Sequence, residues 1–344
     1  MKNLIAITIL FFISVSISQA QYATKKVSKK KQAYTDSIKQ VKYDYIFPIW
    51  GQQVYKRGFD IPYPIGIMGN YIWMEQSILI NNMQLGLKTD NVDIPLTNVD
   101  EFIKFGDNSN TSYSVNVRPD IWIFPFLNVY GIFGAGRSST TVVITEPIEF
   151  PSTVEQGLRT AGVGIMGAFG VGPLWMSLDG NWTWSKPDLL DRPVRVGVFG
   201  IRLGKTFTFS QHPDRNIAIW AGGMRVKMAS ETEGQIKMID ALPPEVWENR
   251  DDFVNRYYDW YDSQPDFIQG KIDQTPLPDI VDRIEQADGD AIVRYGMDKQ
   301  VKQEWNGVIG AQFQWNKRWM LRTEWGIIGD RKSALASLNY RFLL

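Results

Sequence analysis

The fold of this chain is decided by stretches such as Trp319-Met320-Leu321-Arg322-Thr323-Glu324-Trp325. Successive side chains of a β-strand point to opposite faces of the sheet. Here one face carries Trp319, Leu321, Thr323 and Trp325, and the other carries Met320, Arg322 and Glu324. An apolar face opposite a mostly polar face predicts a strand whose two sides have different surroundings.

The same alternation recurs from about residue 74 onward. Most of these segments span ten residues or more, whereas strands of globular proteins average about five or six. A tilted strand needs about nine to eleven residues to cross the hydrocarbon layer of a membrane. We expect ten such strands, at 74–88, 111–124, 126–140, 159–171, 174–185, 192–209, 216–229, 303–315, 318–328 and 333–343.

Lipid offers no hydrogen-bond partner to the backbone, so strands can span a membrane only as a closed barrel. The predicted fold class is therefore all-β: an antiparallel transmembrane β-barrel of about ten strands, covering residues 74–344. Segments 159–171 and 192–209 are apolar on both faces over part of their length, which leaves eight to twelve strands open. A secreted, water-soluble β-sandwich is the alternative architecture.

The connections between these strands alternate in length. Short ones lie at Pro125, Gly172-Pro173, 211–215 and 316–317, and those between them are mostly longer. Outer-membrane barrels have short periplasmic turns and longer extracellular loops. The alternation predicts that both ends of the barrel domain lie on the periplasmic side.

The N-terminal region divides into three segments. Residues 1–20 have a basic start, an apolar run and a small-residue ending, as a secretory signal peptide does; an N-terminal membrane anchor is the alternative. Residues 21–45 are lysine-rich, which predicts a flexible tail that is either simply solvated or in contact with an anionic envelope surface. Residues 46–73 are apolar but interrupted by prolines, and we treat them as a candidate plug inside the barrel.

Composition excludes several classes of function. The chain has no cysteine and a single histidine, His212, so thiol chemistry is absent and histidine-based catalysis and metal binding are disfavoured. Lysines plus arginines equal aspartates plus glutamates at 37 each, which gives no reason to expect a nucleic-acid partner. We expect no cofactor, no bound metal and no enzymatic activity.

The residues above resemble those of Gram-negative outer-membrane β-barrel proteins, as a class rather than as one family. The resemblance rests on the signal-peptide pattern, the two-faced strands and the aromatic ending Leu338-Asn339-Tyr340-Arg341-Phe342, from which this chain departs by adding Leu343-Leu344. It implies location in the cell outer membrane, with outer-membrane lipid and, during biogenesis, the barrel assembly machinery as partners.

Residues 230–302 form an acidic insert, with 17 acidic and 8 basic residues. We expect a helix from about residue 243 to 262 with an apolar stripe of Trp247, Val254, Tyr258 and Tyr261, and a second helix at 278–287. Because successive strands would cross the membrane in alternate directions, we expect the insert to lie outside the cell. It is either a lid, a plug or a subdomain that binds an extracellular ligand or protein, or a solvated cap whose stripe packs on the barrel rim.

Two local motifs have structural explanations. Gly162-Val163-Gly164-Ile165-Met166-Gly167 matches the spelling of a dinucleotide fingerprint, but no helix follows it. Its small face would instead let another element, such as 46–73, approach the wall closely. Asp288-Gly289-Asp290 is only a fragment of a calcium loop.

Polar residues on the second face of the strands are the candidate functional set. They would face the lumen, where they either fill it as a salt-bridged network or form a polar path: Asp179, Asn181, Arg225, Lys227, Arg322 and Glu324.

The sequence favours a non-enzymatic outer-membrane barrel whose loops and insert serve binding or envelope structure. A narrow, plug-gated channel for a small solute is the alternative, and a barrel enzyme is the least favoured reading.

Overall fold

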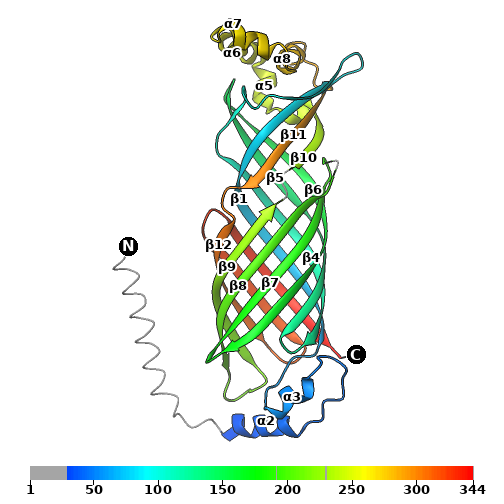
Figure 1. Ribbon diagram of the computed structural model, residues 1–344, viewed down its shortest axis with the longest axis vertical. Coiled ribbons are helices and arrows are strands. Elements are labelled where there is room, and N and C mark those ends of the chain that lie inside the picture. The colour runs from blue at the N-terminus through cyan, green and yellow to red at the C-terminus, as the bar shows by residue number, and fades with distance from the viewer. Residues whose placement is uncertain (1–28, 191, 229–230, 344) are drawn as a thin grey trace, which may run out of the picture.

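The computed structural model describes residues 29–190, 192–228 and 231–343, and within them ten long strands close into an antiparallel barrel (Figure 1). Each strand pairs with its neighbour in sequence, and β1 closes the ring against β14, from Ile65 beside Phe342 to Glu75 beside Lys332. All ten predicted strands are present. They are β1 Ile65–Lys88, β4 Asn108–Phe124, β5 Leu127–Glu146, β6 Phe150–Val171, β7 Leu174–Pro187, β8 Val194–Thr208, β9 Asn216–Met228, β12 Trp305–Gln314, β13 Trp319–Ile328 and β14 Lys332–Phe342.

Four further strands extend the wall above the barrel, where the sequence pattern predicted loops and an insert. The upper half of β1 leaves β14 and β4 and pairs instead with β11 Ile292–Val301 on one edge and with β2 Asp93–Asn98 on the other. Strand β10 Glu231–Lys237 pairs with β11, and β3 Lys104–Phe105 pairs with the upper end of β5. Figure 1 shows β11 and β10 on this upper extension. Segments 89–110 and 230–302 are therefore partly strand.

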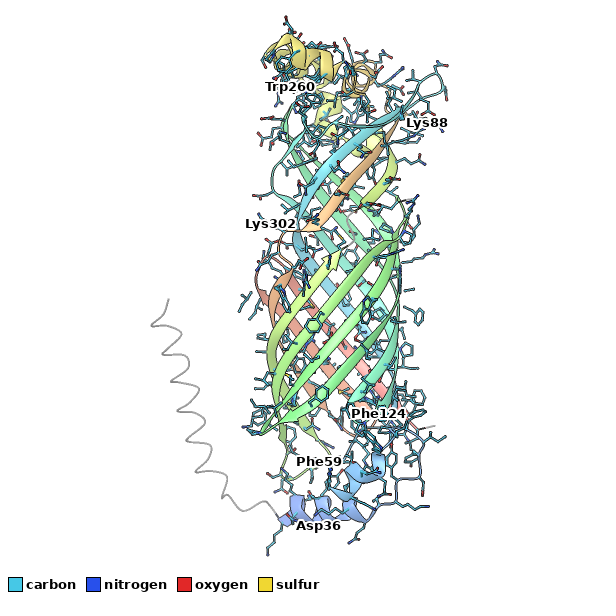
Figure 2. All side chains as sticks on the ribbon, viewed as in Figure 1. Asp36, Phe59, Lys88, Phe124, Trp260 and Lys302 are labelled. Carbon is cyan, nitrogen blue, oxygen red and sulfur yellow. The ribbon has the colours of Figure 1, made fainter. Side chains whose placement is uncertain are left out.

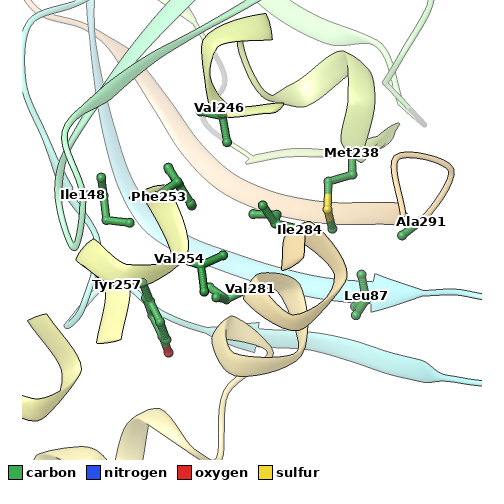
Figure 3. Close-up of a cluster of buried hydrophobic side chains, with 10 residues drawn as sticks. All are labelled: Leu87, Ile148, Met238, Val246, Phe253, Val254, Tyr257, Val281, Ile284 and Ala291. Carbon is green, nitrogen blue, oxygen red and sulfur yellow. The ribbon is translucent and has the colours of Figure 1, made fainter. Parts of the chain in front are cut away.

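Five short helices between β10 and β11 form a cap at the upper end: α4 Met238–Ala241, α5 Pro244–Glu248, α6 Arg250–Asp262, α7 Asp266–Ile272 and α8 Leu277–Glu285. The helix predicted at 243–262 is broken at Asn249, whose backbone (φ −115°, ψ 39°) is not helical. The break separates Trp247 from the rest of the predicted stripe. Within α6 the buried face consists of Phe253, Val254 and Tyr257, so Tyr258, predicted to be in the stripe, lies at its edge and is 42% exposed. Figure 3 shows Tyr257 and Val254 of α6 beside Val281 of α8.

The segment expected to plug the lumen lies at the lower mouth instead. Helices α2 Lys29–Gln40 and α3 Gly51–Lys56 sit below the barrel (Figure 1), so part of the tail predicted to be flexible at 21–45 is helical. The ring of Trp50 packs 4.9 Å from that of Phe124, and the backbone N–H of Ile49 donates to the carbonyl of Ile123. From Ile65 onward the segment is barrel wall, because no proline follows Pro64 within it. The predicted signal peptide at 1–20 lies outside the described residues.

An ion pair fastens these helices to the barrel. Nζ of Lys317, in the turn between β12 and β13, lies 2.6 Å from Oδ1 of Asp60, and the hydroxyl of Tyr34 donates to Oδ2 of the same carboxylate. Burial alone would lower the pKa of Lys317, but its contacts with Asp60 outweigh this and raise it.

The outer wall of the barrel carries exposed apolar side chains on all ten strands. Figure 2 shows side chains projecting from this surface between Phe124, near the lower mouth, and the level of Lys302. Mid-strand residues such as Ile201, Ile165 and Ile309 are 39–41% exposed, which water would penalise and lipid favours. Tryptophans and phenylalanines lie toward the strand ends, where aromatic side chains favour the membrane interface: Trp182, Trp184, Phe199, Trp305 and Trp325 above, and Phe169, Phe207 and Trp319 below.

No helix among the described residues is long and apolar enough to cross a membrane.

Candidate functional site

A network of ion pairs around Arg202 crosses the middle of the lumen. Arg202 on β8 forms a bidentate ion pair with Glu324 on β13. Its Nε and Nη2 lie 2.6 Å and 2.8 Å from the two carboxylate oxygens. Its third nitrogen, Nη1, contacts the carboxylate of Asp179 on β7. All three side chains are nearly buried. Paired, hydrogen-bonded charges are the form in which ionised groups tolerate burial.

Aromatic and cationic groups complete this network. The indole Nε1–H of Trp220 donates to Glu324 over 2.8 Å, and Nη2 of Arg322 lies 3.0 Å from the same oxygen. The guanidinium of Arg118 stacks 3.5 Å from the ring centre of Tyr130, whose hydroxyl donates to Asn181. Contacts therefore join β4, β5, β7, β8, β9 and β13 across the interior.

Two further polar layers lie below and above it. Near the lower mouth, Arg341 pairs with Asp120 at 2.8 Å, and Asn128 donates to the same carboxylate. Near the upper end, Nε of Arg331, which is 1% exposed, donates to the side-chain oxygen of Gln76. Between the side chains of the middle of the barrel a cavity of about 330 Å³ remains. Small barrels are commonly filled in this way.

Glycines on the strands make room for the lumen side chains. A Cβ at Gly200 would lie 2.6 Å from Oδ1 of Asp179, and one at Gly66 would lie 2.8 Å from Oδ2 of Asp120. The glycine motif at 162–167 has the same explanation, since a Cβ at Gly164 would collide with the ring of Tyr130 and with Asn181. The small face therefore admits neighbouring side chains rather than the segment 46–73.

The structure divides the six predicted lumen residues into two groups. Four of them line the lumen cavity: Asp179, Asn181, Arg322 and Glu324. Arg225 and Lys227 line a shallow depression on the outer surface instead, and Arg225 pairs with Glu304 at 2.6 Å. The prediction was wrong for these two because Trp220, Met224 and Val226 occupy the lumen face of β9, against the rule that its apolar face meets lipid.

Sequence reasoning missed the central member of the network, Arg202. It lies in the segment 192–209, whose faces did not resolve because both are apolar near Val198 and Phe199. An arginine between Ile201 and Leu203 in the middle of the strand was the available signal, because an unpaired charge there would be costly.

The remaining candidates from the sequence have structural roles. His212 is exposed in the turn between β8 and β9, where its backbone N–H donates to Phe209 and its carbonyl accepts from Arg215. Asp288 accepts a hydrogen bond from the N–H of Ala291, and Asp290 pairs with Lys237. No cluster of three or more His, Cys, Asp or Glu side chains suited to a metal occurs in the described part of the chain.

Above the barrel, the strand extension and the cap enclose an apolar chamber of about 210 Å³. Its sides are β1, β5, β6 and β11, and its roof consists of α4, α6 and α8. Roof residues such as Met238 (0% exposed) and Ile284 (2% exposed) belong to the buried cluster in Figure 3. Near the roof, the hydroxyl of Ser152 on β6 donates to the carbonyl of Ala241.

One charged side chain, Lys299 on β11, is found among the described residues that line the chamber. Lys299 pairs with Ile80 on β1, two residues above the point where β1 leaves β4, so it lies at the floor of the chamber. Its ammonium group has no hydrogen bond or ion pair to any described residue, and burial lowers its pKa to about 8.

No protein-family model matches this chain, and no curated protein matches it in sequence. Solved structures with a similar fold include the β-domain of the Bordetella autotransporter BrkA, at 9% identity and TM-score 0.37, covering 81% of this chain and 100% of that one. The translocator domain of NalP from Neisseria meningitidis is 10% identical, with TM-score 0.33 and coverage of 96% and 98%. An outer-membrane channel from Pseudomonas putida F1 is 10% identical, with TM-score 0.31 and coverage of 83% and 97%.

The assignment of the barrel itself rests on the strand pairing of this chain.

Glu324→Gln should destabilise the barrel strongly. It removes the buried carboxylate that pairs with Arg202 and Arg322. Breaking a buried ion pair typically costs about 3–5 kcal/mol. The measurement is the free energy of unfolding in guanidinium chloride, with the protein in lipid vesicles. Glu304→Gln is the matched control: it breaks the exposed pair with Arg225 and should cost about 1 kcal/mol or less. An equal loss of unfolding free energy in the two variants would contradict a lumen network that stabilises the barrel.

Lys299→Met should leave the protein at least as stable as the parent at pH 7, because methionine fits an apolar wall without a charge to desolvate. The lowered pKa also predicts a pH dependence. Between about pH 8 and the pKa of an unfolded lysine, near 10.4, the unfolded chain binds more protons, so the parent gains stability as pH rises. The variant should lack this gain.

The measurement is the guanidinium chloride concentration at the midpoint of unfolding, at pH 7, 8, 9 and 10. Lys302→Met is the control, since Lys302 is exposed and paired with Asp107. A pronounced loss of stability in Lys299→Met at pH 7 would show that the lysine has a structural partner.

Proposed function

We propose that this protein is a non-enzymatic outer-membrane β-barrel that does not conduct solutes and that holds a ligand-binding chamber outside the membrane. The observation that carries the proposal is the contrast between the two interiors. The lumen is crossed by buried ion pairs, whereas the space above it is an apolar chamber under a helical cap.

The outer-membrane location is supported by the exposed apolar belt with aromatic residues toward both ends. The orientation is supported by the short turns and the helices α2 and α3 at one end and the cap at the other (Figure 1). In the proposed orientation the cap is extracellular and α2 and α3 are periplasmic.

A binding role for the chamber is supported by its composition. Ligand sites are concave and mostly apolar, with a few polar groups that fix orientation. Most of the lining is apolar, and the polar side chains are few: Thr140, Ser152, Gln156, Tyr257, Tyr295 and Lys299. Because the cap is held mainly by packing and by surface pairs such as Lys271 with Glu101, 3.1 Å apart, it can act as a lid.

A narrow channel is the second candidate. The lumen cavity of about 330 Å³ favours a channel, because it shows that side chains do not fill the lumen completely. Passage would require the contacts of Arg202 with Glu324 and Asp179 to separate. The two candidates differ in electrical conductance.

Replacing residues 238–291 by Asn-Gly tests the proposal. Lys237 and Ile292 pair directly, so a two-residue turn can join β10 to β11 as a hairpin. We expect the shortened protein to insert as a barrel, to remain silent in planar bilayers like the parent, and to lose binding of the neutral apolar dye N-phenyl-1-naphthylamine.

The parent protein in amphipol is the positive sample in the dye measurement, and amphipol alone gives the background. Stepwise ion conductance of the parent would contradict a closed lumen and favour the channel. Equal dye binding with and without the cap would contradict a chamber that binds ligands.

A further inference from the structure

Lys299 is an anomaly in an otherwise apolar enclosure. Its neighbours on the same face of β11 are Tyr295 and Met297, and the opposite walls at this level contribute Thr140 and Gln156. No described carboxylate contacts it. The acidic side chains of the cap do not enter the chamber; those that form contacts, such as Asp290 with Lys237, do so at the surface.

A desolvated ammonium group without a partner destabilises a fold, and a methionine in its place would not. Two buried cations of the barrel interior have carboxylate partners, Arg202 with Asp179 and Glu324 and Arg341 with Asp120. Arg331 has only the side-chain oxygen of Gln76, and its two terminal nitrogens are buried in the barrel without a partner among the described residues. Lys299 is different because the space beside it is open chamber. A bound anion would supply the missing counter-charge.

We propose that the chamber binds a single-chain amphiphile whose anionic head group pairs with Lys299; this inference rests on the binding role proposed above. The slender shape follows from the volume of about 210 Å³, which is below the roughly 300–1,000 Å³ typical of small-molecule sites. A lysine forms a point-charge contact with any compact anion, so carboxylate and sulfate heads share this chemistry.

The placement of the groups sets the orientation of the ligand. Lys299, Thr140 and Gln156 lie toward the floor, where Thr140 pairs with Asn110 at the top of β4. The roof is formed by apolar side chains such as Met238, Val281 and Ile284. The head group therefore points toward the barrel and the hydrocarbon tail points toward the cap.

The experiment compares dodecanoate with dodecanol, which have the same chain length and differ in head-group charge. Full-length protein is reconstituted in amphipol, binding is measured by native mass spectrometry, and amphipol alone gives the background. We expect the parent to bind dodecanoate at least tenfold more tightly than dodecanol. Lys299→Met should abolish the preference for dodecanoate but still bind dodecanol. Lys299→Arg should show the same preference for dodecanoate as the parent.

Lys302→Met is the matched control and should behave as the parent, because that lysine is outside the chamber lining. Dodecyl sulfate in place of dodecanoate should also prefer the parent over Lys299→Met. Equal affinity of the parent for dodecanoate and dodecanol, or unchanged dodecanoate binding in Lys299→Met, would overturn the head-group inference while leaving an apolar chamber intact. Absence of binding by both ligands would overturn the proposed binding function as well.

Discussion

Everything in this structure depends on closing the ladder of backbone hydrogen bonds. In lipid each unpaired N–H or C=O is costly, so the ten strands must form a ring without an edge. Strand β1 is the key element, since its lower half pairs with β14 and β4 and its upper half pairs with β11 and β2. The same strand therefore closes the membrane barrel and forms a wall of the chamber above it.

A ring of ten strands is narrow, and this fixes what the lumen can contain. Its interior is filled by side chains held at three levels by Asp120, Glu324 and Gln76 with their arginine partners. Such filling is common in small barrels, and here it leaves a lumen cavity of about 330 Å³. The apolar interior lies above, in a region where water replaces lipid outside and where helices rather than strands cover the opening.

Much of the barrel could be predicted from the sequence because lipid imposes a period of two. The stretch around Arg322 and Glu324 gives the correct strand, the correct faces and the correct lumen residues. The assignment of apolar side chains to lipid failed on β9, where apolar side chains also pack in the lumen. Trp220 points inward and donates a hydrogen bond to Glu324, so Arg225 and Lys227 lie on the outer face. Alternation alone does not distinguish an apolar side chain in the lumen from one in lipid.

The chamber could not be predicted in this way. Its floor lysine is one of eight basic residues in an acidic insert, and only the register of Lys299 with Ile80 brings it under the cap. Likewise, the packing of α6 against α8 and the strands decides that Tyr257 rather than Tyr258 is buried. Contacts between distant segments decide both features. Export through residues 1–20 and recognition by the barrel assembly machinery remain predictions.

Site-directed spin labelling tests most directly whether lipid surrounds the outer wall. The chain has no native cysteine, so single cysteines can be introduced without other changes. For labels at 319, 321, 323 and 325 in lipid vesicles, the account predicts high collision rates with oxygen and low rates with a water-soluble nickel complex. Labels at 320 and 322 should be protected from oxygen. High accessibility of positions 321 and 323 to the nickel complex, without alternation along the strand, would contradict a membrane-spanning barrel.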